Sequence, residues 1–289
     1  MLRFTKIICT LGPSVAAPEY ILHMATAGMN VARVNLSHGS REQHRSFMRM
    51  VRDLNTQGTL TKMSPSISCL SLLVDTKGAE IRTGECDPPV TITKDQEVIF
   101  SFRNPVEELR PVILVNHEGF AEHVRRADRI LVDNGKLSFD IISIEPDGAV
   151  IARAREDGTI GSRRHINLPG AGVDLPPFTA RDWDDIAFAA DEGADFIGLS
   201  FIQRGQEVEE VRTFLRKRGS PAGIVAKIET QHAVQNVSEI LHAADALMVA
   251  RGDLGAEVPF ERVPVIQDEI GALCREAGKP VIVEEEETP

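Results

Sequence analysis

Short apolar runs alternate with segments of helical periodicity at both ends of the chain. Runs that end at Gly or at charged residues are typical of parallel strands covered on both faces. Seven such runs occur, at residues 6–10, 30–36, 70–77, 196–201, 223–230, 246–250 and 280–283. Strands that alternate with helices form parallel βα units. The pattern therefore predicts an α/β fold of the TIM-type (β/α)8 barrel class, incomplete at seven recognisable strands.

The pattern changes between residues 84 and 166, where short alternating runs follow one another and helical periodicity is weak. Turn signals separate these runs, among them Asp-Asn-Gly at 133–135 and Asp-Gly at 157–158. We therefore predict a β-rich domain at 84–166, inserted into a barrel domain made of residues 1–83 and 167–289.

The stretch 246–255 joins a predicted buried strand to a charged turn rich in Gly. The turn places the carboxylate of Asp253 at the carboxyl end of the strand, where ligands bind in α/β folds. The alternative is a plain connection from strand to helix, in which Asp253 caps the helix.

The strand 223–230 carries Lys227 and Glu229, which share one face because strand side chains alternate with period two. Burying both charges is unfavourable unless they pair or hold a ligand. One interpretation is an internal ion pair. The other is a Mg²⁺ site formed by Glu229 and Asp253, since Mg²⁺ typically takes one or two carboxylates together with water and phosphate. Lys227 beside such a metal suits a transferring phosphoryl group.

Composition excludes several classes of function. A net charge of −11 over 289 residues argues against a general nucleic-acid binder and against adhesion to anionic membranes. No apolar run approaches the ~18 residues of a membrane span, and the N-terminus lacks the features of a signal peptide. The four Cys are scattered and form no CxxC motif, which favours reduced thiols and a cytoplasmic location.

Seven ordered motifs resemble those of the pyruvate kinase family. They are 30–39 (NVARVNLSHG), 75–84 (DTKGAEIRTG), 132–135 (VDNG), 167–176 (NLPGAGVDLP), 226–229 (AKIE), 248–255 (MVARGDLG) and 278–283 (GKPVIV). The resemblance extends from Lys6 to Val283. It implies a (β/α)8 barrel with a small β-barrel lid domain inserted after the third strand, in agreement with the pattern above.

The resemblance also implies a role for each matching residue in transferring a phosphoryl group from phosphoenolpyruvate to ADP. Lys227 and Arg33 would be the catalytic residues, with Lys227 stabilising the group in flight and Arg33 holding phosphate. The Mg²⁺ ligands would be Glu229 and Asp253. The K⁺ ligands would be Asn35, Ser37, Asp75 and Thr76, and Glu80 goes with K⁺-dependent members of the family.

Further implied contacts concern the two substrates. Gly252 and Asp253 would offer backbone N–H groups at a helix N-terminus to the substrate carboxylate. Arg82 and Arg164 would approach the nucleotide phosphates. Asp133 would belong to the lid as it closes on the site.

The tail departs from the family pattern. Where the family continues with Ala-Thr-Gln-Met-Leu-Glu-Ser, residues 284–289 read Glu-Glu-Glu-Glu-Thr-Pro, so Glu285 stands in place of an active-site Thr. The Glu at 284–287 either repel an anionic substrate or form a solvated terminus without a role. The eighth strand and the C-terminal domain are absent, which leaves open strand edges. Because open edges pair with other chains, we predict a homo-oligomer.

Three functions fit these observations. The leading one is a pyruvate kinase-like phosphotransferase that uses Mg²⁺ and K⁺. The second is a catalytically degenerate homologue that binds phosphoenolpyruvate-like acids or a partner chain. The third is a Mg²⁺-dependent lyase or aldolase acting on pyruvate-type acids, although the inserted domain argues against it.

Overall fold

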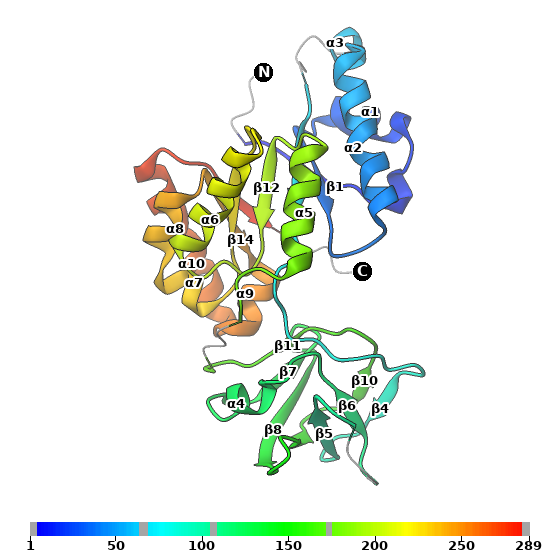
Figure 1. Ribbon diagram of the computed structural model, residues 1–289, viewed down its shortest axis with the longest axis vertical. Helices are drawn as coiled ribbons and strands as arrows, with labels where there is room; N and C mark the ends of the chain where they lie inside the picture. The colour runs from blue at the N-terminus through cyan, green and yellow to red at the C-terminus, as the bar shows by residue number, and fades with distance from the viewer. Residues whose placement is uncertain (1–4, 64–68, 105–108, 172–174, 285–289) are drawn as a thin grey trace.

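A seven-stranded parallel sheet forms the centre of the computed structural model, which describes residues 5–63, 69–104, 109–171 and 175–284 (Figure 1). The strands lie in the sheet in chain order: β1 (Ile8–Thr10), β2 (Val31–Asn35), β3 (Ser71–Asp75), β12 (Phe196–Leu199), β13 (Gly223–Ile228), β14 (Ala246–Ala250) and β15 (Val281–Glu284). No described residue pairs β1 with β15, so the sheet is open. It is also curled. Arg33 lies on β2, the second strand of the sheet, yet it forms an ion pair with Glu284 of β15, the last strand.

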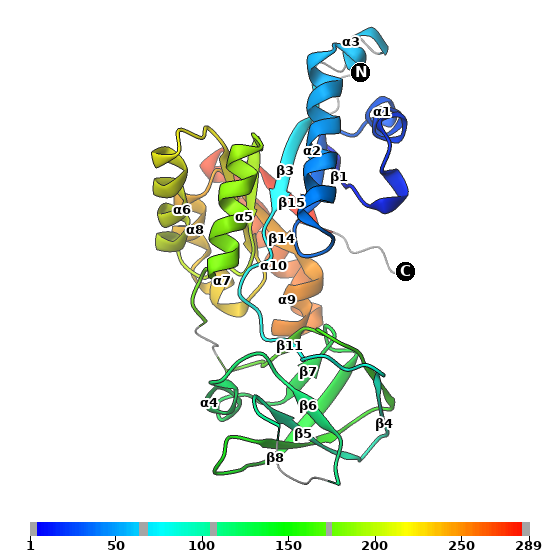
Figure 2. The same ribbon diagram turned by 45° about the vertical axis from the view of Figure 1, so that its right-hand side comes forward.

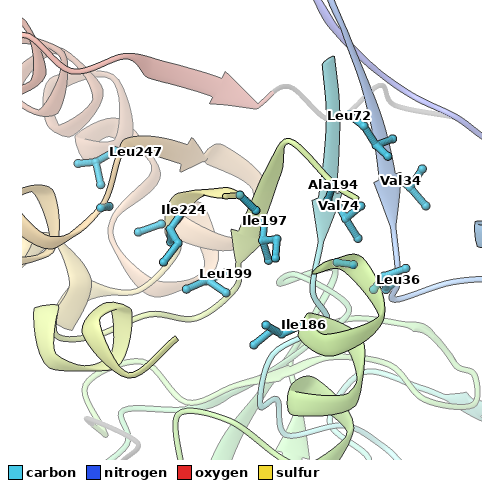
Figure 3. Packing of buried hydrophobic residues seen from close by; sticks show 14 of the residues in the cluster. Val34, Leu36, Leu72, Val74, Ile186, Ala194, Ile197, Leu199, Ile224 and Leu247 are labelled. Atoms are coloured by element: carbon cyan, nitrogen blue, oxygen red, sulfur yellow. The ribbon is translucent and has the colours of Figure 1, made fainter. Parts of the chain in front are cut away.

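Alternate residues of each strand pack outward against the helices. Figure 3 shows this layer between the sheet and α5 (Ala180–Asp191), which contributes Ile186. Its labelled strand residues are Val34, Leu72, Val74, Ile197, Leu199, Ile224 and Leu247. The intervening positions face the inside of the curl and form a second, smaller apolar cluster, with Ile8, Val31, Leu73, Phe196, Val225, Met248 and Ile282 among its members.

Helices cover the outer face of the sheet (Figures 1 and 2). Besides α5 they are α1 (Pro18–Ala27), α2 (Arg41–Thr56), α3 (Thr59–Met63), α6 (Gly205–Lys217), α7 (Gln231–Gln235), α8 (Val237–Ala243), α9 (Arg251–Glu257) and α10 (Val263–Ala277), with short 3₁₀ turns η1 (Pro13–Val15) and η2 (Phe260–Arg262). Ser40 caps α2, because its side chain accepts a hydrogen bond from the backbone N–H of Gln43. Among the described residues, no helix combines the length and the apolar character that crossing a bilayer requires.

The inserted segment folds into strands around a core of its own, below the barrel in Figure 2. Its elements are β4 (Val90–Ile92), β5 (Glu97–Ser101), β6 (Val112–Leu114), α4 (Phe120–Val124), β7 (Ile130–Val132), β8 (Leu137–Ile144), β9 (Val150–Ala154), β10 (Gly158–Ile160) and β11 (Ile166–Asn167). Six strands form one sheet in the order β11-β7-β8-β9-β5-β6, and β10 pairs with β4. Phe100 lies at the centre of the core, with the ring of Phe139 edge-on at 5.1 Å.

The predicted α/β class and all seven barrel strands are confirmed. Between β13 and β14 the chain forms two helices, α7 and α8, separated by Asn236, which donates its side-chain N–H to the carbonyl of Gln203. One detail differs from the prediction. The lid sheet includes Asn167, one residue past the predicted lid boundary, since β11 pairs with β7. The domain limits themselves stay a prediction.

Candidate active site

Charged side chains form a layer directly above the inner apolar cluster, at the carboxyl ends of the strands. The alternation of strand side chains explains this placement. Val31 lies in the apolar cluster and Arg33, two residues on, lies above it. The same step leads from Leu73 to Asp75 on β3. It recurs from Val225 to Lys227 and from Ile282 to Glu284, so four strands contribute to one charged layer.

Lys227 lies in the middle of this layer, and only 7% of its side chain is exposed. Its Nζ is 2.7 Å from Glu229 Oε1, 3.4 Å from Asp75 Oδ2 and 3.6 Å from Glu284 Oε2. It also donates to Ser200 Oγ at 3.4 Å. Burial by itself would lower the pKa of Lys227, but the three carboxylates outweigh burial and raise the pKa, so the ammonium stays charged.

Arg33 uses its whole guanidinium group within the layer. Its Nε and Nη2 both donate to Asp75 Oδ2. Its Nη1 donates to Thr10 Oγ1 at 3.3 Å and forms an ion pair with Glu284 Oε1. The guanidinium group therefore connects three strands, β1, β3 and β15.

Glu229 and Asp253 form a pair of adjacent acidic groups. Burial raises the pKa of Glu229 to about 7, with a further contribution from the negative charge of Asp253 and an opposing one from Lys227. Its Oε2 accepts the backbone N–H of Phe201 at 2.5 Å. Burial would raise the pKa of Asp253 as well, but His165, whose Nδ1 is 3.8 Å from Asp253 Oδ1, helps to lower it. Two carboxylates that share a buried position favour a proton or a cation between them.

This pair suits a metal that takes few protein ligands. Among the described residues, no group of three or more His, Cys, Asp or Glu side chains could hold a metal ion. Glu229 and Asp253 supply two oxygen ligands, which is the usual protein contribution to a Mg²⁺ site completed by water and phosphate. The predicted internal pairing of Lys227 with Glu229 is also present, so the two interpretations of the strand 223–230 do not exclude each other.

Asp75 leaves one carboxylate oxygen without a partner. Oδ2 receives Arg33 and Lys227, but Oδ1 is fully buried and has no hydrogen bond. A β-carbon at position 198 would overlap this oxygen, so only Gly198 leaves room for it. A buried, unpaired carboxylate oxygen is unfavourable unless a cation or a proton satisfies it.

Of the other predicted K⁺ ligands, Asn35 ends β2, whereas Ser37 and Thr76 follow β2 and β3. Asn35 Oδ1 accepts the backbone N–H of Ser37 at 2.9 Å. Thr76 accepts two hydrogen bonds from Ser200, whose backbone N–H donates to Thr76 Oγ1 at 3.3 Å and whose hydroxyl donates to the Thr76 carbonyl at 2.8 Å. Glu80 receives both Nε and Nη2 of Arg82. Asn35 is the register partner of Asp75 on the neighbouring strand and Thr76 follows Asp75 in the chain, so these two residues adjoin Asp75.

One cavity of about 690 Å³ unites the barrel end and the lid. The predicted site residues that line it are Arg33, Asn35, Ser37, Arg82, Asp133, Arg164, Lys227, Glu229 and Asp253. Asp75 and Thr76 are buried and do not line this cavity, and neither does Gly252, which is partly exposed in the first turn of α9. On the lid side, Arg164 Nη1 is 3.5 Å from Asp133 Oδ1.

Comparison with known sequences decides the family. A sequence model described as "Pyruvate kinase, barrel domain" matches residues 2–286. The chain belongs to the pyruvate kinase family. It is 40% identical to plastidial pyruvate kinase 2 of Arabidopsis thaliana, over 97% of this chain and 47% of that protein. It is 37% identical to chloroplastic pyruvate kinase isozyme G of Nicotiana tabacum, over 97% and 48%, and 38% identical to the pyruvate kinase of Staphylococcus epidermidis, over 97% and 47%.

The chain spans about half the length of the curated pyruvate kinases that it matches. The match of residues 2–286 to the pyruvate kinase barrel domain confirms the resemblance that the motifs indicated. The individual roles of the site residues stay predictions.

Two residues of the site, Ser200 and His165, escaped the sequence interpretation. For Glu284 the sequence left two alternatives, repulsion of an anionic substrate or a solvated terminus. The structure contradicts the second, because Glu284 ends β15 and contacts Arg33 and Lys227. The alternation from Ile282 to Glu284 could have revealed its inward direction. Glu285 to Glu287 lie outside the described residues. Ser200 and His165 reach the site through the loop after β12 and the lid segment before β11, which strand patterns do not position.

Proposed function

We propose that the chain forms the catalytic module of a phosphotransferase that converts phosphoenolpyruvate and ADP to pyruvate and ATP. The observation that carries the proposal is one cavity at the carboxyl ends of parallel strands, which Arg33, Lys227, Glu229 and Asp253 line together. Two cations beside a carboxylate pair suit a phosphoryl group in flight, because its charge must be stabilised where it develops. Membership of the pyruvate kinase family supports the same assignment.

Glu229 and Asp253 are the proposed Mg²⁺ ligands. Their closeness and the pKa of Glu229, raised to about 7 by burial, fit a position that gains stability from a bound cation. When bound, Mg²⁺ would neutralise negative charge on the phosphate oxygens of the substrates. Lys227 would hold the transferring group beside the metal, since its Nζ lies 2.7 Å from Glu229.

Asp75 is the proposed centre of the K⁺ site, with Asn35, Ser37 and Thr76. The unpaired, buried Asp75 Oδ1 supports this proposal because a cation would satisfy it. Asp75 also fixes Arg33, so a cation at this position would couple to the orientation of the guanidinium group.

Arg82 and Arg164 are the proposed nucleotide contacts. Both line the cavity from the side of the lid, and the guanidinium of Arg164 is half exposed. Guanidinium groups bind phosphate oxygens in a bidentate manner, so these two would hold the nucleotide phosphates. Gly252 and Asp253, in the first turn of α9, are the proposed contacts for the substrate carboxylate.

The direct test is ATP formation from phosphoenolpyruvate and ADP with Mg²⁺, in the presence and absence of K⁺. The matched inactive variant is Lys227→Met, which keeps the length of the side chain and removes its charge. We expect K⁺-stimulated ATP formation that the variant lacks. A folded wild-type protein that forms no more ATP than the variant would refute the proposal.

A catalytically degenerate binder is the second candidate, and the position of Glu284 favours it. Its carboxylate lies between Arg33 and Lys227, where an anionic substrate would have to bind. Such a protein would bind Mg²⁺ and an acid without transferring phosphate, which the same assay separates from the first candidate.

The remaining expectations concern assembly and location. The open edges β1 and β15 support a proposed homo-oligomer, which light scattering at micromolar concentration would test; a monomer would refute it. No described Cys forms a disulfide, which supports the proposed cytoplasmic location. We keep small molecules, rather than nucleic acid or membranes, as the proposed partners because of the net charge of −11.

A further inference from the structure

Glu284 lies on the inner face of the sheet rather than at its rim. Ile282, two residues earlier, packs in the inner apolar cluster, whereas Val281 packs against the outer core. The alternation of β15 therefore directs Glu284 inward, and its register partner Ala250 ends the adjacent strand β14. This position puts a third carboxylate into the charged layer, beside Asp75 and Glu229.

All three guanidinium nitrogens of Arg33 and the Nζ of Lys227 already have partners in this layer. Arg33 gives Nε and Nη2 to Asp75, and Nη1 to Thr10 and Glu284. Lys227 faces Glu229, Asp75, Glu284 and the hydroxyl of Ser200. An anion that binds between Arg33 and Lys227 therefore competes with the carboxylates that these two side chains already contact.

Glu284 is the carboxylate best able to withdraw. Its side chain is 18% exposed, whereas those of Asp75 and Glu229 are 1% exposed. Asp75 is enclosed by Gly198 and bound twice by Arg33, and Glu229 is held by the backbone N–H of Phe201. Within the part of the chain that the structure describes, no backbone N–H donates to the Glu284 carboxylate, and β15 is an edge strand of the sheet.

We infer that Glu284 is a built-in occupant of an anion site between Arg33 and Lys227, and that it competes with phosphate or carboxylate ligands for these two cations. The inference rests on the proposed function, because the competing anion would be the phosphoryl group of that reaction. One carboxylate oxygen of Glu284 contacts Arg33 and the other contacts Lys227. Two oxygens of a bound phosphate would have to take the places of these two carboxylate oxygens. Ligand binding then requires the end of β15 to move or its carboxylate to turn away.

The test measures binding of inorganic phosphate by calorimetry in metal-free buffer, without turnover. Glu284→Gln removes the charge and keeps the shape of the side chain, and Glu284→Ala removes the competing oxygens altogether. Glu276→Gln, at an exposed position near the end of α10, changes the net charge equally and serves as the control. We expect both Glu284 variants to bind phosphate about tenfold more tightly than the wild type, which corresponds to about 1.4 kcal/mol. The control should bind like the wild type.

Several results would overturn the inference. They are wild-type or weaker phosphate affinity in a folded Glu284 variant, absence of any binding heat from both variants at millimolar phosphate, or an equal gain in Glu276→Gln. The outcome is separate from that of the ATP assay. A gain in phosphate affinity without any ATP formation would support the competing carboxylate and reject the phosphotransferase, whereas ATP formation with unchanged phosphate affinity would do the reverse.

Discussion

Lys227 should contribute more to stability than an exposed lysine, because it neutralises a buried cluster of carboxylates. In Lys227→Met the side chain keeps its length, but Glu229 retains only the N–H of Phe201 as a favourable partner. Asp75 and Glu284 still form ion pairs with Arg33. Removing one partner of a buried ion pair costs about 3–5 kcal/mol, and we expect a loss of this size in the free energy of unfolding at about pH 8.

The pH dependence of this loss distinguishes electrostatics from packing. Lys227 lowers the pKa of Glu229, so the pKa of Glu229 should rise further in the variant. At about pH 6 the variant can then protonate Glu229 and avoid a buried charge, which should make its deficit smaller than at about pH 8. Urea unfolding of both proteins at the two pH values measures the difference.

Lys136→Met is the matched control for the removal of a lysine. The side chain of Lys136 is 74% exposed and lies 3.1 Å from Asp133, and such a surface pair contributes less than about 1 kcal/mol. A Lys227→Met protein as stable as this control, or one with the same deficit at both pH values, would refute the reasoning.

Three further predictions concern the same charged layer. Gly198→Ala should lower the free energy of unfolding in urea by about 1–3 kcal/mol, because the added β-carbon overlaps Asp75 Oδ1. Gly12→Ala is the control and should leave the free energy of unfolding unchanged, because its β-carbon meets no atom within 4 Å. Equal effects of the two substitutions would contradict this account. Folding raises the pKa of Glu229 from 4.5 to about 7, so its contribution to stability should fall by at most about 3 kcal/mol as pH rises through that interval. The difference in free energy of unfolding between the wild type and Glu229→Gln should therefore change with pH. A difference that stays constant over this pH interval would reject the prediction. Mg²⁺ should raise the melting temperature of the wild type at about pH 8 but not that of Asp253→Asn. The increase should become smaller below about pH 7, because Glu229 then takes up a proton. An equal increase in both proteins would exclude Asp253 as a ligand.

The sequence predicts those parts of the site that depend on a single strand. Alternation correctly places Lys227 beside Glu229, because period two is a local property of extended backbone. The carboxyl end of each strand likewise predicts where Asp253 lies.

Features that depend on curvature or on the inserted domain are not available from local patterns. The contact between Arg33 and Glu284 exists because the sheet curls until β2 faces β15. His165 reaches Asp253 only because β11 pairs within the lid sheet. The pairing of Arg82 with Glu80 depends on the conformation of the chain between the two domains.

The charged layer contains more negative than positive groups, and this imbalance connects the separate inferences. Asp75, Glu229 and Glu284 carry three potential negative charges, whereas Arg33 and Lys227 carry two positive ones. Buried charge without a partner is unfavourable, so the layer should gain stability whenever the excess is removed. A proton on Glu229, a divalent cation bound with Asp253, or the departure of Glu284 would each remove it. If a metal and an anionic ligand bind together, the metal would compensate the carboxylates and the ligand would replace Glu284. Cation and anion should therefore favour each other's binding at this site.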